Sequence, residues 1–286
     1  MKVEGVARAT LRFADSVLRR LTAGLRMLPD FLIIGAQKCG TTALYQYLTE
    51  HPCIAAAFVK EVQFFHRADN FERGVNWYRA HFPLRTRRWW RQRLGRGPLL
   101  TGEATPLMFH PHASRRVHEL IPRAKLIVVM RNPVDRAYSH YHHQLIRGRE
   151  TLSFEEAIQA EPQRLAGEFA RMESDESYQS RSYTAYSYLA RGLYLEQIQR
   201  WERYFPRQQI LFVSSEQFFA DPRTAFAQTI AFLDLPPHVL KRAKPHNVGR
   251  YDKAMSASTR AMLLEYFKPH NRRLFEYLQM DWGWDS

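Results

Sequence analysis

The sequence predicts an α/β fold, with a three-layer α/β/α arrangement around a central parallel sheet. Two observations predict it. Four short runs of the 286-residue chain are rich in Val, Ile, Leu or Phe and do not alternate with polar residues, which is typical of strands buried on both faces. Stretches with helical periodicity separate these runs, and such alternation favours parallel strands covered by helices on both sides.

The first expected element is a basic amphipathic helix in residues 1–30. Phe13, Val17, Leu21 and Leu25 recur in it at a spacing of four, and arginines interrupt it. Such a helix more often packs on its own domain; the alternative is that it lies on a membrane surface. The segment lacks the compact apolar part of a secretory signal. No run of about 18 apolar residues occurs, so we expect no transmembrane span.

The four apolar runs occupy residues 31–35, 98–102, 125–130 and 209–213, and the third, KLIVVM, is the strongest. Helical patterns occupy residues 41–50, 111–121, 133–147, 192–204, 222–233 and 256–278. The last pattern ends in DWGWDS, whose tryptophans we expect to cap the core. We assign residues 31–286 to one domain, because no repeat or linker divides them. Ligands of such sheets bind beyond the carboxyl ends of the strands, so we expect the site just after the first three runs.

The composition indicates an anionic ligand. Lys and Arg number 42 against 28 Asp and Glu, giving a net charge of +14. That charge suits nucleotides, nucleic acid, acidic polysaccharides or a membrane surface, and does not choose among them. Two cysteines are too few for a zinc pattern or a disulfide framework. Free thiols are typical of a reducing compartment, and we expect a cytoplasmic protein.

The segment GAQKCGTTAL follows the first apolar run and opens a helix. Glycines let backbone amides approach a ligand, and a helix N-terminus binds anions through its free amides and dipole. The phosphate loop of nucleotide hydrolases reads G-x-x-x-x-G-K-[ST], whereas the lysine here comes two residues before the second glycine. A tight strand-to-helix turn is the alternative. The residues of the expected P-loop-like anion site are Lys38, Cys39, Gly40, Thr41 and Thr42.

A second motif, RNPVDRAYSHY, follows the third apolar run. Arg131 comes directly after the run, and Ser139 lies two turns into the helix that starts at Asn132-Pro133. An arginine fork and a serine hydroxyl can together bind a phosphate. The alternative is that Arg131 pairs with Asp135 while Ser139 faces solvent. Taken with the first loop, the motif indicates a ligand that carries phosphates at two places.

These two segments resemble the cofactor motifs of sulfotransferases that use 3′-phosphoadenosine 5′-phosphosulfate (PAPS), and are most similar to the heparan-sulfate N- and 3-O-sulfotransferase branch. The likeness covers about residues 31–284 and includes KEVQFF, GEATP and HNVGRYDKAMS. It implies that the first loop holds the 5′-phosphosulfate and that Arg131 and Ser139 hold the 3′-phosphate. It also implies that Gly249, Arg250 and Tyr251 lie near the adenine or the phosphates.

The resemblance makes Glu61 the candidate general base, whereas the sequence alone favours a surface pair of Lys60 and Glu61. Lys38 is expected to stabilise the leaving group. Gln63 stands where polysaccharide O-sulfating relatives often have histidine, and looks more like the N-sulfating relatives. Ala104 stands where a second lysine is usual, so neither that lysine nor the acceptor is fixed by the resemblance. His66 or His110 is the alternative base.

Two other features suggest weaker hypotheses. His140 and His143 lie three apart on one expected helix face, but no carboxylate or cysteine completes a site, and we expect no metal. Residues 84–96 carry six arginines, two tryptophans and no acid. They form either a solvated basic helix with its tryptophans packed inward or a contact for an acidic acceptor or a membrane. No nucleic-acid module surrounds them, so we expect no nucleic acid partner.

The predicted function is transfer of a sulfuryl group from PAPS to a hydroxyl or amine of an acceptor, with a carbohydrate or glycan favoured. One rival is a P-loop nucleotide kinase, which needs the absent G-K-[ST] and an acidic metal ligand. Another is a non-catalytic polyanion-binding protein.

Overall fold

The computed structural model describes residues 15–241 and 254–284. Its centre is a five-stranded sheet in the order β2-β3-β1-β4-β5, and every neighbouring pair of strands is parallel. The strands are β1 (Phe31–Gly35), β2 (Ile54–Ala56), β3 (Leu100–Ala104), β4 (Lys125–Met130) and β5 (Ile210–Ser214). The predicted fold class is confirmed.

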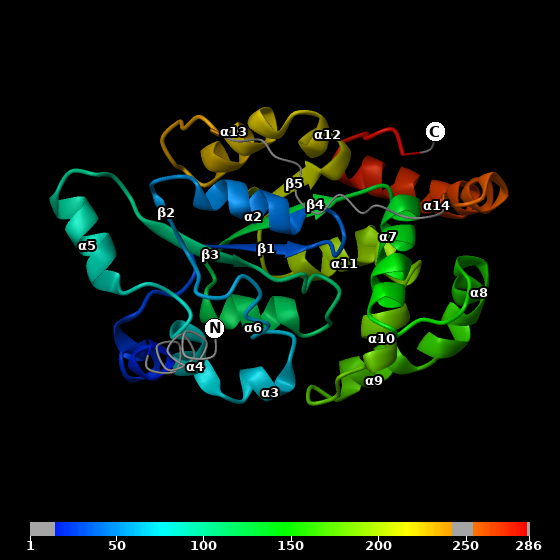
Figure 1. Ribbon diagram of the computed structural model, residues 1–286, viewed down its shortest axis with the longest axis horizontal. Coiled ribbons are helices and arrows are strands. Elements are labelled where there is room, and N and C mark those ends of the chain that lie inside the picture. Colours follow the sequence, from blue (N-terminus) through cyan, green and yellow to red (C-terminus); the bar gives the residue numbers. More distant parts are fainter. Residues whose placement is uncertain (1–14, 242–253, 285–286) are drawn as a thin grey trace, which may run out of the picture.

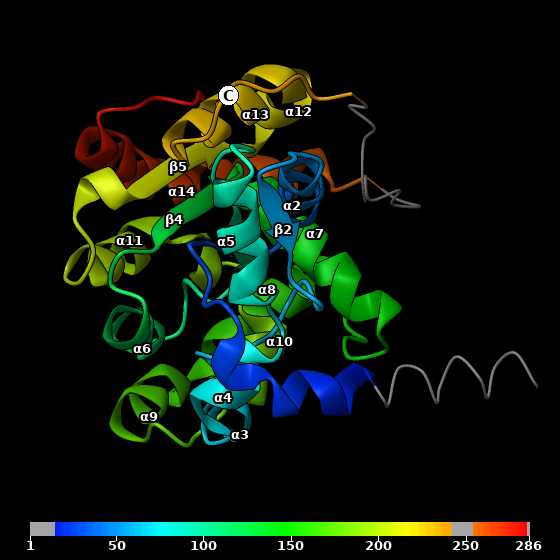
Figure 2. The same cartoon turned by 90° about the vertical axis from the view of Figure 1, so that its left-hand side faces the viewer.

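Helices cover both faces of this sheet. Helices α2, α12 and α13 lie on one face, and α6 and α11 lie on the other (Figures 1 and 2). Helices α7 to α10 extend the molecule beyond the carboxyl ends of the strands, while α5 projects at the opposite end (Figure 1).

The bounds of the helices are α2 (Thr41–Thr49), α3 (Ala68–Phe71), α4 (Gly74–Arg79), α5 (Arg85–Arg93), α6 (Ala113–Leu120), α7 (Pro133–Ile146), α8 (Phe154–Leu165), α9 (Glu168–Ser174), α10 (Arg181–Tyr186), α11 (Tyr194–Glu202), α12 (Ser215–Ala220), α13 (Pro222–Phe232) and α14 (Ala257–Leu278), with short 3₁₀ turns η1 (Ala23–Leu25), η2 (Ala190–Gly192) and η3 (Arg207–Gln209).

The core follows the apolar runs. All five residues of β1 are buried, and so are the last five of β4, because both strands lie inside the sheet with helices on each face. Gly102 of β3 pairs with Phe31 of β1, and a Cβ at that glycine would lie 2.5 Å from the Phe31 carbonyl oxygen. Only glycine allows that approach. Trp284 is buried in the same core, as expected for the C-terminal tryptophans.

Two strand predictions need correction. The run predicted at 98–102 forms β3 at Leu100–Ala104, because the ladder with β1 carries it past a buried carboxylate, Glu103. A buried acid is invisible to a hydropathy pattern. The edge strand β2 was not predicted, and it pairs only with β3. Its three residues are too few to show a pattern.

The N-terminal helix also differs from the expectation. Residues 15–21 are helical, but Val17, Leu21 and Leu25 are exposed, so this row of side chains does not pack on the domain. Phe13 lies outside the described residues. None of the helices that the structure describes combines the length and the hydropathy needed to cross a membrane.

Candidate active site at the carboxyl edge of the sheet

The loop between β1 and α2 forms the floor of a cleft. Gly40 precedes α2 with a φ of 99°, and a Cβ there would lie 3.0 Å from the ring of Phe219. Both facts require glycine. The first turn of α2 contains no acid, so the free amides and the positive end of the helix remain available to an anion. Lys38, with a φ of 71°, lines the same cleft.

Cys39 departs from the other residues of this loop. Its side chain is fully buried and its sulfur lies 3.8 Å from the Tyr194 hydroxyl, away from the cleft. Burial raises the pKa of the thiol to about 11. The predicted contact of Cys39 with a cofactor therefore does not include its side chain, which packs in the core.

The second motif begins where β4 ends. Arg131 follows β4 directly, and the Asn132 side chain caps α7. Ser139 is buried in α7 and lines the cleft. Asp135 pairs with Arg260 of α14 at 2.7 Å, so the alternative in which Asp135 pairs with Arg131 and Ser139 faces solvent is wrong.

One cleft of about 920 Å³ brings the two motifs together. Within the described part of the chain, no ion pair with a carboxylate is formed by Lys38, Arg131 or Arg147, and all three line the cleft. Burial lowers the pKa of Lys38, and the nearby Arg131 and Arg147 lower it further. Uncompensated cations around an enclosed space favour a multiply charged anion there. The residues predicted from the two motifs that line the cleft are Lys38, Gly40, Thr41, Thr42, Arg131 and Ser139, and Glu61, the candidate base implied by the resemblance, lines it too.

Glu61 enters the cleft from the segment after β2. Its carboxylate forms an ion pair with Lys60, and both side chains are about one third exposed. The Lys60 ammonium also donates to the Thr42 hydroxyl at 2.8 Å. The local Lys–Glu pair expected from the sequence alone therefore exists, and it also connects the candidate base to the start of α2. The contact of Lys60 with Thr42 was not predicted from the sequence.

Glu103 holds this segment in place. It is fully buried at the end of β3, where it accepts hydrogen bonds from the Val62 amide at 2.9 Å, the Tyr78 hydroxyl and the Thr105 hydroxyl, the last two at 2.6 Å. Burial raises the pKa of Glu103 in spite of these donors. The residue after Glu61 is thus fixed to the central sheet. Its neighbour Ala104 is fully buried and leaves no side chain in the cleft.

The alternative bases are poor proton acceptors. Burial lowers the pKa of His66 to about 3, and burial with the neighbouring His66 lowers that of His110 to about 2. Both histidines line the cleft as neutral imidazoles. A base with so low a pKa accepts a proton weakly near neutral pH.

Other side chains of the cleft were not predicted. Arg191 is buried, donates to the Gln37 side chain at 2.8 Å and lies 3.6 Å from the centre of the Phe109 ring. Burial lowers its pKa to about 9. Arg191 therefore braces the loop beside Lys38. Gln37 is too distant in sequence from Arg191 for the pair to be identified from the sequence alone.

The candidate histidine pair does not form a metal site. His140 is buried against Tyr188 while His143 lines the cleft, so the two do not share a site. In the part of the chain that the structure describes, no three His, Cys, Asp or Glu side chains are grouped as a metal site requires. The remaining predicted cofactor contacts lie outside the described residues, and they are Gly249, Arg250 and Tyr251.

A parallel sheet with a cleft beyond the carboxyl ends of its strands is typical of α/β proteins that bind a nucleotide phosphate at a strand-to-helix loop. Residues 28–265 match the family model of the sulfotransferase domain. The chain therefore belongs to the sulfotransferase family.

Individual proteins similar to this chain are also sulfotransferases. The chain is 31% identical to the human bifunctional heparan sulfate N-deacetylase/N-sulfotransferase 3, with 88% of the chain covered but only 30% of that protein. It is 33% identical to the human heparan sulfate glucosamine 3-O-sulfotransferase 6, with 91% of the chain and 75% of the relative covered. A crystal structure of a sulfotransferase from Alicyclobacillus acidocaldarius aligns with a TM-score of 0.67 at 30% identity, covering 91% of the chain and all of that structure.

Proposed function

We propose that this protein transfers the sulfuryl group of PAPS to a hydroxyl or amine of a carbohydrate acceptor. The observation that carries the proposal is the cleft itself. A helix N-terminus and a lysine lie at one strand end, and an arginine with a buried serine lies at the neighbouring strand end. Membership of the sulfotransferase family supports this donor over other bisphosphates.

The residues present fit the donor. Lys38, Arg131 and Arg147 have no carboxylate partner within the described chain, which is the arrangement expected where phosphates complete the charge balance. Thr41, Thr42 and the first amides of α2 would hold the 5′-phosphate, and Arg131 with Ser139 would hold the 3′-phosphate. When bound, the donor supplies an activated sulfuryl group with adenosine 3′,5′-bisphosphate as the leaving group.

Three groups of the chain would carry the catalysis. Lys38 would stabilise negative charge as it develops on the bridging oxygen, a role in which a preorganised cation in an enclosed site is most effective. Glu61 would accept the proton of the attacking hydroxyl or amine. Lys60, which contacts both Glu61 and Thr42, would fix the position of the Glu61 carboxylate relative to the phosphate loop.

The proposal for the class of acceptor rests on the part of the cleft lining that comes from α9, α10 and the segments next to them. Helices α9 and α10 contribute Met172 and Thr184 there, next to Arg149 and Gln179, and this mixed lining suits a hydroxylated and partly anionic ligand. The two human relatives are named for heparan sulfate, which supports a glycan. Gln63 lies in the cleft near the candidate base, and it favours an amine acceptor if the resemblance to N-sulfating relatives extends to specificity.

The test combines binding with turnover. Adenosine 3′,5′-bisphosphate should raise the melting temperature of the protein, whereas ATP with Mg²⁺ should not. Labelled sulfate should then pass from PAPS to at least one member of a panel of amino and hydroxylated glycans. A shift with ATP-Mg²⁺ alone would favour the kinase. Binding of sulfated polysaccharide without any nucleotide effect would favour the polyanion-binding protein.

A further inference from the structure

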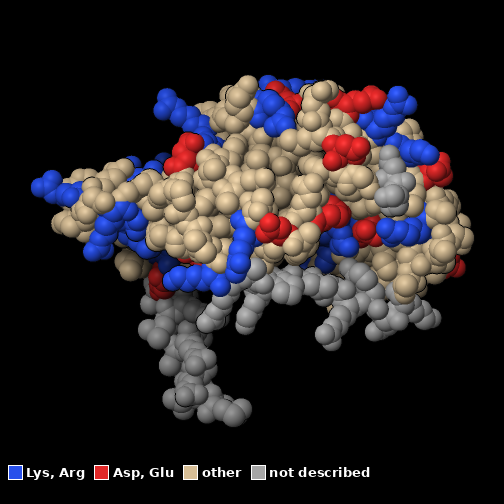
Figure 3. All heavy atoms as spheres, turned by 90° about the horizontal axis from the view of Figure 1, so that it is seen from above, with Lys and Arg blue, Asp and Glu red and all other residues tan. Residues whose placement is uncertain are grey.

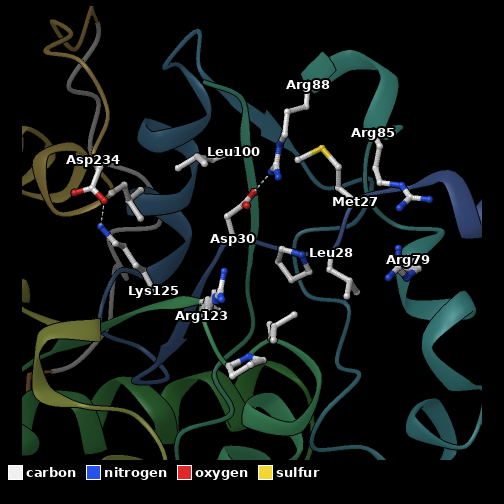
Figure 4. A pocket seen from close by; sticks show the side chains of 15 residues that line it. Met27, Leu28, Asp30, Arg79, Arg85, Arg88, Leu100, Arg123, Lys125 and Asp234 are labelled. Carbon is white, nitrogen blue, oxygen red and sulfur yellow. Dashed lines mark hydrogen bonds and ion pairs between the residues drawn. The ribbon is translucent and has the colours of Figure 1, made fainter. Parts of the chain in front are cut away.

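A second pocket, of about 520 Å³, lies at the amino edge of the sheet (Figure 4). Apolar side chains such as Met27, Leu28 and Leu100 line it together with a group of cations. The cations are Arg79, Arg85, Arg88, Arg123 and Lys125, and the acids are Asp30 and Asp234. The pocket lies at the amino ends of the strands, whereas the sulfotransferase cleft lies at their carboxyl ends.

Among the described residues, acids neutralise two of these five cations. Arg88 pairs with Asp30 and Lys125 pairs with Asp234 (Figure 4). Arg79 and Arg85 each donate to a backbone carbonyl, which leaves their charges uncompensated. Arg123 is exposed, and the described chain offers it no hydrogen-bond or ion-pair partner. The pocket therefore carries an excess of positive charge at an open, partly apolar surface.

Helix α5 extends this basic surface outward. None of its residues is buried, and Trp89 and Trp90 are 52% and 55% exposed. Their rings contact each other at 4.7 Å between centroids. The expected inward packing of this tryptophan pair is therefore wrong. Lys and Arg side chains gather at this projecting end of the molecule (Figure 3).

The N-terminal helix adds apolar side chains beside the pocket. Leu18, Leu21 and Leu25 are exposed, Leu21 by 80%. Arg85 of α5 donates to the Gly24 carbonyl at 2.6 Å, which joins this segment to α5. Both elements face the viewer in Figure 2. This end of the molecule thus carries exposed leucines and tryptophans together with uncompensated arginines.

The composition of this face selects its occupant. An acidic polysaccharide would satisfy the arginines but would leave the leucines in water. A membrane surface accommodates all three kinds of side chain: leucines in the acyl boundary, tryptophans at the interface and arginines at anionic headgroups. We propose that the amino edge of the sheet binds the surface of a membrane that contains anionic phospholipid, with the pocket beside Arg123 receiving a headgroup phosphate. The sulfotransferase cleft then faces away from the membrane and stays open to its acceptor.

Vesicle sedimentation tests the proposal. The full chain should sediment with vesicles of phosphatidylcholine and phosphatidylglycerol more than with phosphatidylcholine alone, and salt should weaken this binding. The side chain of Arg87 in α5 is exposed and, like that of Arg123, has no hydrogen-bond or ion-pair partner among the described residues. The variant Arg87→Glu/Arg123→Glu should bind the anionic vesicles roughly tenfold more weakly or worse. Leu21→Ser/Trp90→Ser should also bind more weakly while keeping the salt dependence.

The matched control is Arg203→Glu/Arg273→Glu, which makes the same change in net charge just after α11 and in α14. It should bind vesicles like the wild type, and each variant should keep the wild-type melting temperature. Equal losses in the control and the test variant would reduce the effect to net charge and overturn the proposal. So would absence of vesicle binding, and if heparin binding were then lost in Arg87→Glu/Arg123→Glu, the face would be a polysaccharide site instead.

Discussion

The two edges of the central sheet carry basic side chains in opposite ways. At the carboxyl edge, Lys38 and Arg131 line an enclosed cleft without carboxylate partners among the described residues. At the amino edge, Arg88 and Lys125 are paired with acids, and the uncompensated arginines lie at an open surface. Charge in an enclosed site acts strongly on one bound group, whereas charge at a surface acts weakly and is screened by salt. Substitutions at the two edges should therefore differ in size.

Replacement of Lys38 should have the largest effect. We expect Lys38→Ala to lower turnover by about 10³-fold, because the site then lacks the cation nearest to the proposed leaving oxygen. Steady-state sulfate transfer from PAPS measures the loss. Arg273→Ala removes one exposed cation from α14 and should leave the rate unchanged. A Lys38→Ala enzyme with wild-type turnover would remove this lysine from the mechanism.

Replacement of Glu61 should come next. We expect Glu61→Gln to reduce turnover by roughly 10²-fold or more, since the amide cannot accept the acceptor's proton. Binding of adenosine 3′,5′-bisphosphate, measured by calorimetry, should stay near that of the wild type. If the variant instead lost nucleotide affinity at unchanged turnover, the Lys60–Glu61 pair would serve the phosphate loop alone, and the base would have to be sought elsewhere.

The contrast between the edges also explains what the sequence could predict. The phosphate loop and the Arg131 motif were identifiable because each follows a strand directly, and the ends of parallel strands meet at one edge. Glu103 and Arg191 were missed because their partners are distant in sequence: the Val62 amide is 41 residues from Glu103, and Gln37 is 154 residues from Arg191. Hydropathy gives no indication of such contacts.

At the amino edge, the apolar pattern of the sequence did not predict which side chains are buried. The spacing of Val17, Leu21 and Leu25 correctly indicated a helix with an apolar row, and inward packing of Trp89 and Trp90 was one of the two alternatives for residues 84–96. Periodicity reports that a helix has an apolar face but not whether the same chain supplies something to cover it. In the structure all five side chains are exposed.

Replacement of Glu103 tests how much its buried hydrogen bonds at the carboxyl edge contribute to the stability of the fold. Glu103→Ala should destabilise the fold by about 3 kcal/mol, because it leaves the Val62 amide and the Tyr78 and Thr105 hydroxyls without their buried acceptor. Thermal unfolding measures this loss. Turnover should also fall because the segment of Glu61 is released. Glu103→Gln keeps one of the two acceptor oxygens and places an amide NH₂ at the other, so it should recover part of both properties; equal defects in the two variants would instead show that one acceptor oxygen at this position is not enough.

The smallest expected effect compares one glycine from each region. Gly40 and Gly95 both have positive φ, so alanine at either position should cost about 1 kcal/mol of backbone strain. A Cβ at Gly95, just after α5, would meet nothing within 4 Å, whereas at Gly40 it would lie 3.0 Å from the Phe219 ring.

Gly40→Ala should therefore lower the melting temperature more than Gly95→Ala. It should also weaken binding of adenosine 3′,5′-bisphosphate, because the Phe219 ring that must move lines the cleft. Melting curves with and without the nucleotide separate the two contributions. If Gly40→Ala matched Gly95→Ala in both measurements, the phosphate loop would be as tolerant as the exposed end of α5. The close packing that distinguishes the carboxyl edge would then not extend to the start of α2.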